Sequence, residues 1–106
     1  MSQRENKVEA YLKLRMTAIG GAAEKHVNPG ANGDPDRLLS FPLGYKCLVE
    51  TKWAEDASMT APHARRQLRR HAWWQQRGMD VYLLKSKAQV DSFIIKMWEL
   101  GYWQMG

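Results

Sequence analysis

The chain has 106 residues but only one cysteine and no long apolar run. A single cysteine, Cys47, excludes an intramolecular disulfide and a cysteine-based zinc site. The longest apolar runs, such as residues 81–84, are too short to span a membrane. The opening segment, MSQRENK, lacks the apolar stretch that follows the charges of a signal peptide. We therefore expect a protein of a reducing cytoplasm that has no membrane partner.

Internal repeats and low-complexity tracts are also missing from the sequence. The one cluster rich in glycine, proline and asparagine, residues 28–35, is too short to link two domains. With 44% hydrophobic residues and five tryptophans, the chain can build one compact core. We predict a single domain over residues 1–106. Its formal net charge of +5 raises the expectation of a polyanionic partner, most often a nucleic acid.

Hydrophobic spacing and turn residues predict the element order α-β-β-β-α-β-α. The predicted helices span residues 3–18, 61–77 and 87–100, and the predicted strands span residues 22–27, 36–41, 45–52 and 79–85. Thr60 is the expected N-cap of the second helix, and residues 86–89 form a capping box before the third. The second and third strands are typical of a hairpin, and the helix that follows makes the third and fourth strands parallel. The predicted fold class is therefore α/β, a small mixed sheet flanked by helices.

Two acids and a lysine are expected to meet on adjacent strands of this sheet. Because side chains alternate along a strand, Glu50 and Lys52 project from one face and Thr51 from the other. The hairpin can bring Asp36, at the start of the neighbouring strand, beside Glu50. Two close carboxylates repel each other unless a cation lies between them or one takes up a proton. A hard divalent ion such as Mg²⁺ suits this place, and the set would suit phosphodiester hydrolysis. A surface charge pattern is the alternative.

The arrangement of Pro35-Asp36 followed by Glu50-x-Lys52 resembles the PD-(D/E)xK nuclease superfamily. More narrowly, the chain resembles a stand-alone VRR-NUC domain, the virus-type replication-repair nuclease. The matching residues extend over about residues 5 to 95 and are Val8-Glu9, Gly20-Gly21, Lys25, residues 29–30 and 33–38, residues 49–52, Gln67 and residues 78–81. The resemblance implies a restriction-endonuclease-like core and a DNA endonuclease that depends on Mg²⁺ or Mn²⁺. It also implies a role in phage replication or DNA repair, in some members on branched DNA, in the cytoplasm of a bacterium or a phage-infected host cell.

The resemblance also implies a role for each matching residue. Asp36 and Glu50 would be the metal-binding acids, and Lys52 would be the catalytic lysine. Glu9 would be the acid from the first helix, acting directly or through a metal-bound water. Gln67 would be the polar residue of the following helix that lies against the active site.

Further residues qualify these roles or add to them. Glu5 competes with Glu9 because the two share a helix face. In the family a serine or threonine usually lies three or four residues before the glutamine, whereas here Pro62-His63-Ala64 occupies that stretch, so the helix start differs. Lys25 could contact the region of the scissile phosphate. Arg37 is either a DNA contact or an ion-pair partner of Asp34.

The helix over residues 61–77 carries arginines but no acid. Four of them form a stripe along one side: Arg65, Arg66, Arg69 and Arg70. Guanidinium groups pair well with phosphates, so this stripe predicts a nucleic-acid contact, with a solvated face as the alternative. Of Trp73 and Trp74, one is expected in the core and the other on a dimer surface, because homodimers are common among similar proteins.

Three histidines, His26, His63 and His71, do not form a metal set, because the last two lie two helical turns apart. Three alternatives to a DNA endonuclease stay open at this point. One is a non-catalytic DNA-binding protein on the same fold, the second is a nuclease directed at RNA, and the third is a partner-binding domain that uses its tryptophans.

Overall fold

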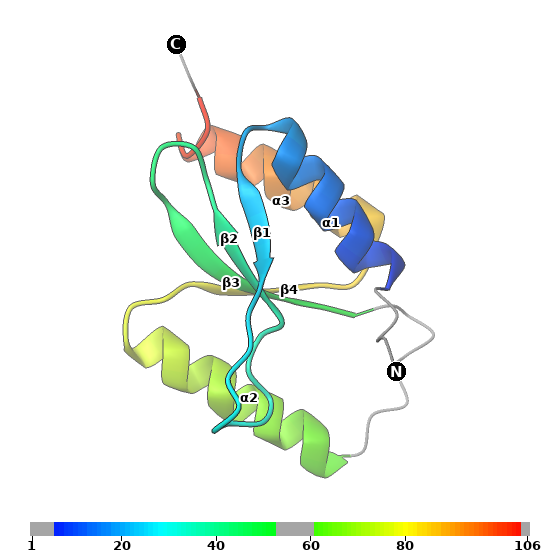
Figure 1. Ribbon diagram of the computed structural model, residues 1–106, viewed down its shortest axis with the longest axis vertical. Coiled ribbons are helices and arrows are strands. Elements are labelled where there is room, and N and C mark those ends of the chain that lie inside the picture. The colour runs from blue at the N-terminus through cyan, green and yellow to red at the C-terminus, as the bar shows by residue number, and fades with distance from the viewer. Residues whose placement is uncertain (1–5, 53–60, 105–106) are drawn as a thin grey trace.

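The computed structural model describes residues 6–52 and 61–104, which form one mixed sheet with helices on both sides (Figure 1). The elements are α1 (Lys7–Ala18), β1 (Ala22–Lys25), β2 (Arg37–Ser40), β3 (Lys46–Thr51), α2 (Ala61–Gln76), β4 (Val81–Leu84) and α3 (Lys87–Glu99). Helices α1 and α3 pack against each other, and α2 lies across the sheet from them (Figure 1). The α/β class and the element order are those expected from the sequence.

The sheet has the order β1-β2-β3-β4. The first three strands are antiparallel neighbours, with Arg37 of β2 opposite Val49 of β3. Strand β4 pairs with β3 in parallel, with Glu50 opposite Leu83. The predicted hairpin and the predicted parallel crossover are therefore both confirmed. No helix among residues 6–52 and 61–104 is long and apolar enough to cross a membrane.

Helix α1 begins at Lys7 because Asn6 caps it. The backbone of Asn6 is extended, and its side-chain oxygen accepts a hydrogen bond from Glu9 N at 2.7 Å. The predicted start at residue 3 is therefore too early; residues 3–5 lie outside the described part of the chain. Val8, Leu12 and Met16 follow at helical spacing and are completely buried.

One face of the sheet carries the hydrophobic core. Cys47 and Val49 of β3 point into it, together with the buried stripes of α1 and α3. In α3 the stripe is Val90, Phe93, Ile94 and Met97. Each fully buried side chain of this size contributes roughly 1.5–3 kcal/mol. The alternate positions of β3, Leu48 and Glu50, are buried on the α2 side. One face of β3 therefore lines the core and the other faces α2.

The loop over residues 26–36 fastens α2 beneath the sheet. Gly33 has a φ of +90° and lies so close to α2 that an added Cβ would be 3.0 Å from the backbone carbon of Arg66. Asp34 of the loop accepts a hydrogen bond from Arg70 of α2, and the ring of His26 meets Trp74 edge-on at 5.5 Å. The expected N-cap of α2, Thr60, lies outside the described residues.

The predicted capping box before α3 is present in a modified form. Ser86 Oγ accepts a hydrogen bond from Gln89 N at 3.1 Å, as expected. The side chain of Gln89 reaches back to Lys85 N at 2.7 Å rather than to Ser86 N. The side chains of Ser86 and Gln89 therefore each accept a hydrogen bond from a backbone N–H group at the start of α3.

Candidate active site

The fold places Asp36 beside the end of β3. Asp36 directly precedes β2, and its Oδ2 accepts a hydrogen bond from Thr51 Oγ1 at 3.2 Å. Its Oδ1 lies 3.4 Å from the backbone nitrogen of Thr51, which donates to it. Because Thr51 follows Glu50 in β3, these two bonds hold the carboxyl group of Asp36 at the end of β3 that carries Glu50.

Both acids have raised pKa values. Burial raises the pKa of Asp36 to about 6, and the nearby carboxylate of Glu9 adds to this, while hydrogen bonds from Thr51 oppose it. Burial also raises the pKa of Glu50 to about 8, with repulsion from Asp36 as the second cause and the ammonium of Lys52 acting in the opposite direction. An ionised pair with no cation beside it would therefore be costly in this buried position. Acids held together against their own repulsion are typical of sites that bind a cation.

One oxygen of this pair has no partner. Glu50 Oε1 is buried and makes no hydrogen bond. An ionised carboxylate only accepts, so this oxygen lacks either a donor or a cation. Carboxylate oxygens are the ligands that Mg²⁺ and Mn²⁺ prefer, and the residues present therefore fit such an ion.

The three predicted metal acids are not equivalent in the structure. Within residues 6–52 and 61–104, no three side chains of His, Cys, Asp or Glu are grouped closely enough to hold a metal ion. Glu9 contributes to the raised pKa of Asp36 and of Glu50, so its charge reaches both. Its own Oε2 accepts a hydrogen bond from Arg37 Nε at 3.0 Å. Ligation of a metal ion by Asp36 and Glu50, like the place of Glu9 in a three-acid set, stays a prediction.

Arg37 has a structural ion-pair partner that neither sequence interpretation named. It is only 3% exposed, so its side chain is not on the surface where DNA could reach it. Its ion pair is with Glu9 rather than Asp34, and its Nη1 also donates to Ala23 O at 3.1 Å. The cause is the direction of Arg37 in β2, which turns it under α1, where it compensates the buried charge of Glu9.

Lys52 and Gln67 belong to different elements. Lys52 directly follows β3, and its backbone nitrogen donates to Leu84 O at 3.0 Å. Its ammonium lowers the pKa of Glu50, which places it within electrostatic range of that acid. Gln67 is 9% exposed, so it is turned inward despite the altered start of its helix.

His71 is a polar residue of this region that sequence reasoning did not include in the site. Its Nε2 lies 4.0 Å from Glu50 Oε1. Burial lowers its pKa, and the charge of Lys52 lowers it further. The signal was its spacing, because His71 follows Gln67 by four residues and therefore shares its helix face.

The arginine stripe of α2 is divided between surface and interior. Arg65, Arg66 and Arg69 are exposed, whereas Arg70 is half-buried and paired with Asp34. Burial alone would raise the pKa of Asp34, but hydrogen bonds from Arg70 and Asn28 outweigh it and lower that pKa. Arg70 therefore has a structural partner, in addition to any contact with nucleic acid. Lys25 is exposed at the end of β1.

Trp73 lies on the outer side of α2 between arginines. The guanidinium carbon of Arg77 is 3.8 Å from the centre of its ring, and that of Arg70 is 4.4 Å away. Such cation–π contacts occupy the ring faces that a base would need for stacking. Trp74 is half-buried against His26 of the loop and is not part of the hydrophobic core, so the expectation that one of the two tryptophans lies in the core is wrong.

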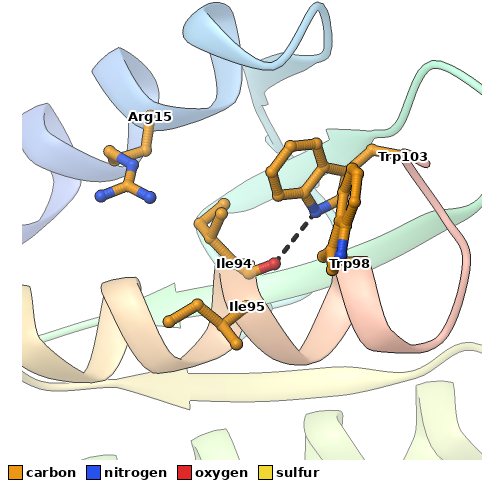
Figure 2. A pocket seen from close by; sticks show the side chains of 5 residues that line it. All are labelled: Arg15, Ile94, Ile95, Trp98 and Trp103. Atoms are coloured by element: carbon orange, nitrogen blue, oxygen red, sulfur yellow. Dashed lines mark hydrogen bonds between the residues drawn. The ribbon is translucent and has the colours of Figure 1, made fainter. Parts of the chain in front are cut away.

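A hollow of about 360 Å³ lies on the α1–α3 side and is lined by Arg15, Ile94, Ile95, Trp98 and Trp103 (Figure 2). Trp103 Nε1 donates to Ile94 O at 2.9 Å and so fixes one wall. Trp98 is 43% exposed, whereas Trp103 packs against the core. This hollow contains none of the predicted catalytic residues.

Comparison with known proteins gives the family. No family model matches the chain. The chain is 38% identical over 84 residues to "Putative nuclease p44" of Acyrthosiphon pisum secondary endosymbiont phage 1, a match that covers 79% of this chain and 85% of that protein. It also superposes on a solved structure described as "VRR_NUC domain" with a TM-score of 0.71 and 35% identity, over 89% of this chain and 97% of the other. The acids at the β2–β3 hairpin and these two matches agree, and the chain belongs to the phage-type VRR-NUC family.

Proposed function

We propose that this chain is a divalent-metal-dependent endonuclease that hydrolyses phosphodiester bonds in DNA. The observation that carries the proposal is the pair of acids, Asp36 and Glu50, whose pKa values burial raises to about 6 and about 8. These two residues would hold Mg²⁺ or Mn²⁺. Similarity to the VRR_NUC domain structure supports the same assignment.

Each side chain around the acids would have its own role in hydrolysis. The cation, when bound, supplies positive charge that polarises the phosphate and a water molecule. Lys52 carries a further positive charge, which would stabilise the charge that develops on the phosphate oxygens. Glu9, fixed by Arg37, supplies negative charge that raises the affinity of the acid pair for a cation. Gln67, facing inward on α2, would orient a water or a phosphate oxygen through its amide.

The substrate reaches the site along a basic surface. Arg65, Arg66 and Arg69 are exposed on a helix without acids, and Lys25 is exposed at the end of β1. Contacts of this kind hold the phosphate backbone without reading bases, so we expect little sequence preference. A preference for branched DNA would follow if two copies placed two sites on one junction. Ile95 and Trp98, exposed beside the hollow of Figure 2, are apolar surface that a second copy would cover.

The test is cleavage of a plasmid and of a synthetic four-way junction, each with Mg²⁺, with Mn²⁺ and with EDTA. We expect cutting with either metal, none with EDTA, and a loss of about 10²-fold or more in Asp36→Asn and in Lys52→Ala. Asp36→Asn keeps a hydrogen-bond acceptor for Thr51, so a loss of cutting in this variant would report the missing charge rather than misfolding. Glu24→Gln, on the exposed β1, is the matched control.

Other outcomes would contradict the proposal. Tight DNA binding without cutting, with both metals and in the wild-type protein, would identify a non-catalytic DNA-binding protein on this fold. Faster cutting of an RNA hairpin than of the DNA substrates would identify RNA as the target. Equal cutting of the junction and of linear duplex would remove branched DNA as the preferred substrate.

A further inference from the structure

Two buried polar atoms face each other across the α2 side of the sheet without forming a hydrogen bond. They are Glu50 Oε1 of β3 and His71 Nε2 of α2, 4.0 Å apart, and neither has a hydrogen-bond partner. A hydrogen bond between nitrogen and oxygen requires about 2.7–3.2 Å. Leaving such a group buried and unpaired costs roughly 1–3 kcal/mol. The two atoms are therefore one small side-chain rotation from a bond that both of them lack.

The backbone of α2, which carries His71, is held in place by an earlier loop of the chain. The loop over residues 26–36 contacts α2 through Gly33, which lies against the backbone of Arg66, and through the ion pair of Asp34 with Arg70. Strand β3 is held by neighbours on both edges, β2 and β4. Because both backbones are fixed, only the side chains of Glu50 and His71 have to turn to close the gap.

The chemistry of the two groups is complementary. An ionised carboxylate accepts only, and a neutral imidazole with its proton on Nε2 donates there. A donor on Oε1 would restrict rotation of the carboxylate and leave Oε2 as the oxygen free to bind a cation. Groups that fix a ligand in this way typically change metal affinity or activity 10–100-fold when removed.

We infer that His71 is a positioning residue of the active site, whose Nε2–H donates to Glu50 Oε1 and so directs Glu50 Oε2 toward the bound cation. The inference rests on the proposed metal site and adds a residue to it. His71 acts through Glu50 and does not itself touch the substrate.

The first measurement is Mn²⁺ binding by calorimetry without DNA. Three variants are compared with the wild-type protein: His71→Gln, which keeps a donor, His71→Leu, which removes it at similar volume, and His63→Leu, a control on the same helix. We expect His71→Leu to bind Mn²⁺ about 10–100-fold more weakly. His71→Gln should lie within about threefold of the wild-type protein and His63→Leu should match it.

Stability in EDTA separates positioning from structure. Replacing an unpaired buried polar group with an apolar one should leave the thermal unfolding midpoint of His71→Leu unchanged or raised. Weaker Mn²⁺ binding in a protein that is equally stable supports positioning. A lowered midpoint together with unchanged Mn²⁺ affinity would overturn the inference, as would a His71→Gln variant as poor as His71→Leu.

Two further measurements do not depend on how His71→Leu folds. In the wild-type protein, long-range ¹H–¹⁵N correlation spectra should place the His71 proton on Nε2, and its resonance should move when Mg²⁺ is added. Kinetics of His71→Gln, which keeps the donor, should likewise stay within about threefold of the wild-type protein in both kcat and KM for DNA. A proton on Nδ1 with Mg²⁺ present would overturn the inference while the proposed function stood. If the wild-type protein bound no Mn²⁺, the proposed function would fail first and the inference with it.

Discussion

Replacing Glu50 with glutamine should stabilise the protein while it destroys the site. The pKa of Glu50 rises from 4.5 to about 8 on folding, so ionisation is more costly in the folded state. The difference grows by about 1.4 kcal/mol per pH unit between these two values, and it reaches about 3 kcal/mol at pH 7. The buried amide of Glu50→Gln costs about 1 kcal/mol in return, because it too lacks partners. A net gain of about 2 kcal/mol would raise the unfolding midpoint by about 10 °C in a domain of this size.

The pH dependence distinguishes charge from packing. A group whose pKa is raised by folding favours the folded state at low pH, and this contribution is lost as pH rises. The free energy of unfolding of the wild-type protein should therefore fall between about pH 5 and pH 8 and level off above. In Glu50→Gln this fall should be strongly reduced, and the two proteins should differ little at pH 5. Urea unfolding in EDTA at pH 5, 7 and 9, followed by circular dichroism, measures this directly.

The matched control is Glu24→Gln, which removes one carboxylate from an exposed position on β1. Its stability should follow that of the wild-type protein within about 0.5 kcal/mol at every pH. The reasoning would be refuted if the stability advantage of Glu50→Gln over the wild-type protein were no larger at pH 9 than at pH 5. Such a result would show that Glu50 ionises at ordinary pH despite its burial, and the argument for a cation between the acids would lose its basis.

Three further predictions concern the supports of the site. Gly33→Ala should destabilise the protein by about 2 kcal/mol, because it combines a φ of +90° with a close approach to α2. Gly44→Ala, at φ +101° with open space around it, should cost about half as much. Equal shifts of the thermal unfolding midpoint in the two variants would contradict this. Arg37→Met should lower the free energy of unfolding in urea by about 3 kcal/mol, because it leaves the buried Glu9 unpaired. The double variant with Glu9→Gln should recover most of this loss. A double variant as unstable as Arg37→Met would contradict the prediction. Combining Arg65→Gln, Arg66→Gln and Arg69→Gln should reduce the slope of log affinity for DNA against log salt by about 2–3, measured in EDTA, and an unchanged slope would move the DNA to another face.

The elements of the fold were predictable because each has a local signal. Alternating and helical spacing located every strand and helix, and the length of the segment between β3 and β4 required a parallel crossover. Boundaries were less accurate where a cap decides them, as at Asn6, whose side chain starts α1 four residues later than the apolar pattern suggests.

The partners of charged residues were not predictable in the same way. Alternation shows that Arg37 and Val49 share a face, but it does not show that α1 brings Glu9 to that place. The pairing of Asp34 with Arg70 joins a loop to a helix, and the helical stripe alone suggested a solvent-facing arginine. His71 stayed outside the predicted site because a single histidine on a helix carries no sign of the strand that packs against it. Such contacts depend on how elements dock, which spacing within one element does not encode.

The parallel pairing of β3 with β4 has a consequence for synthesis of the protein. Residues 48–51 of β3 pair with residues 81–84 of β4, and the backbone nitrogen of Lys52 bonds to Leu84. A ribosome therefore releases every acid of the site well before the strand that completes its sheet. Until β4 leaves the exit tunnel, β3 has an open edge and Lys52 has no backbone anchor. The order of translation thus delays the assembled centre until β4 has been synthesised.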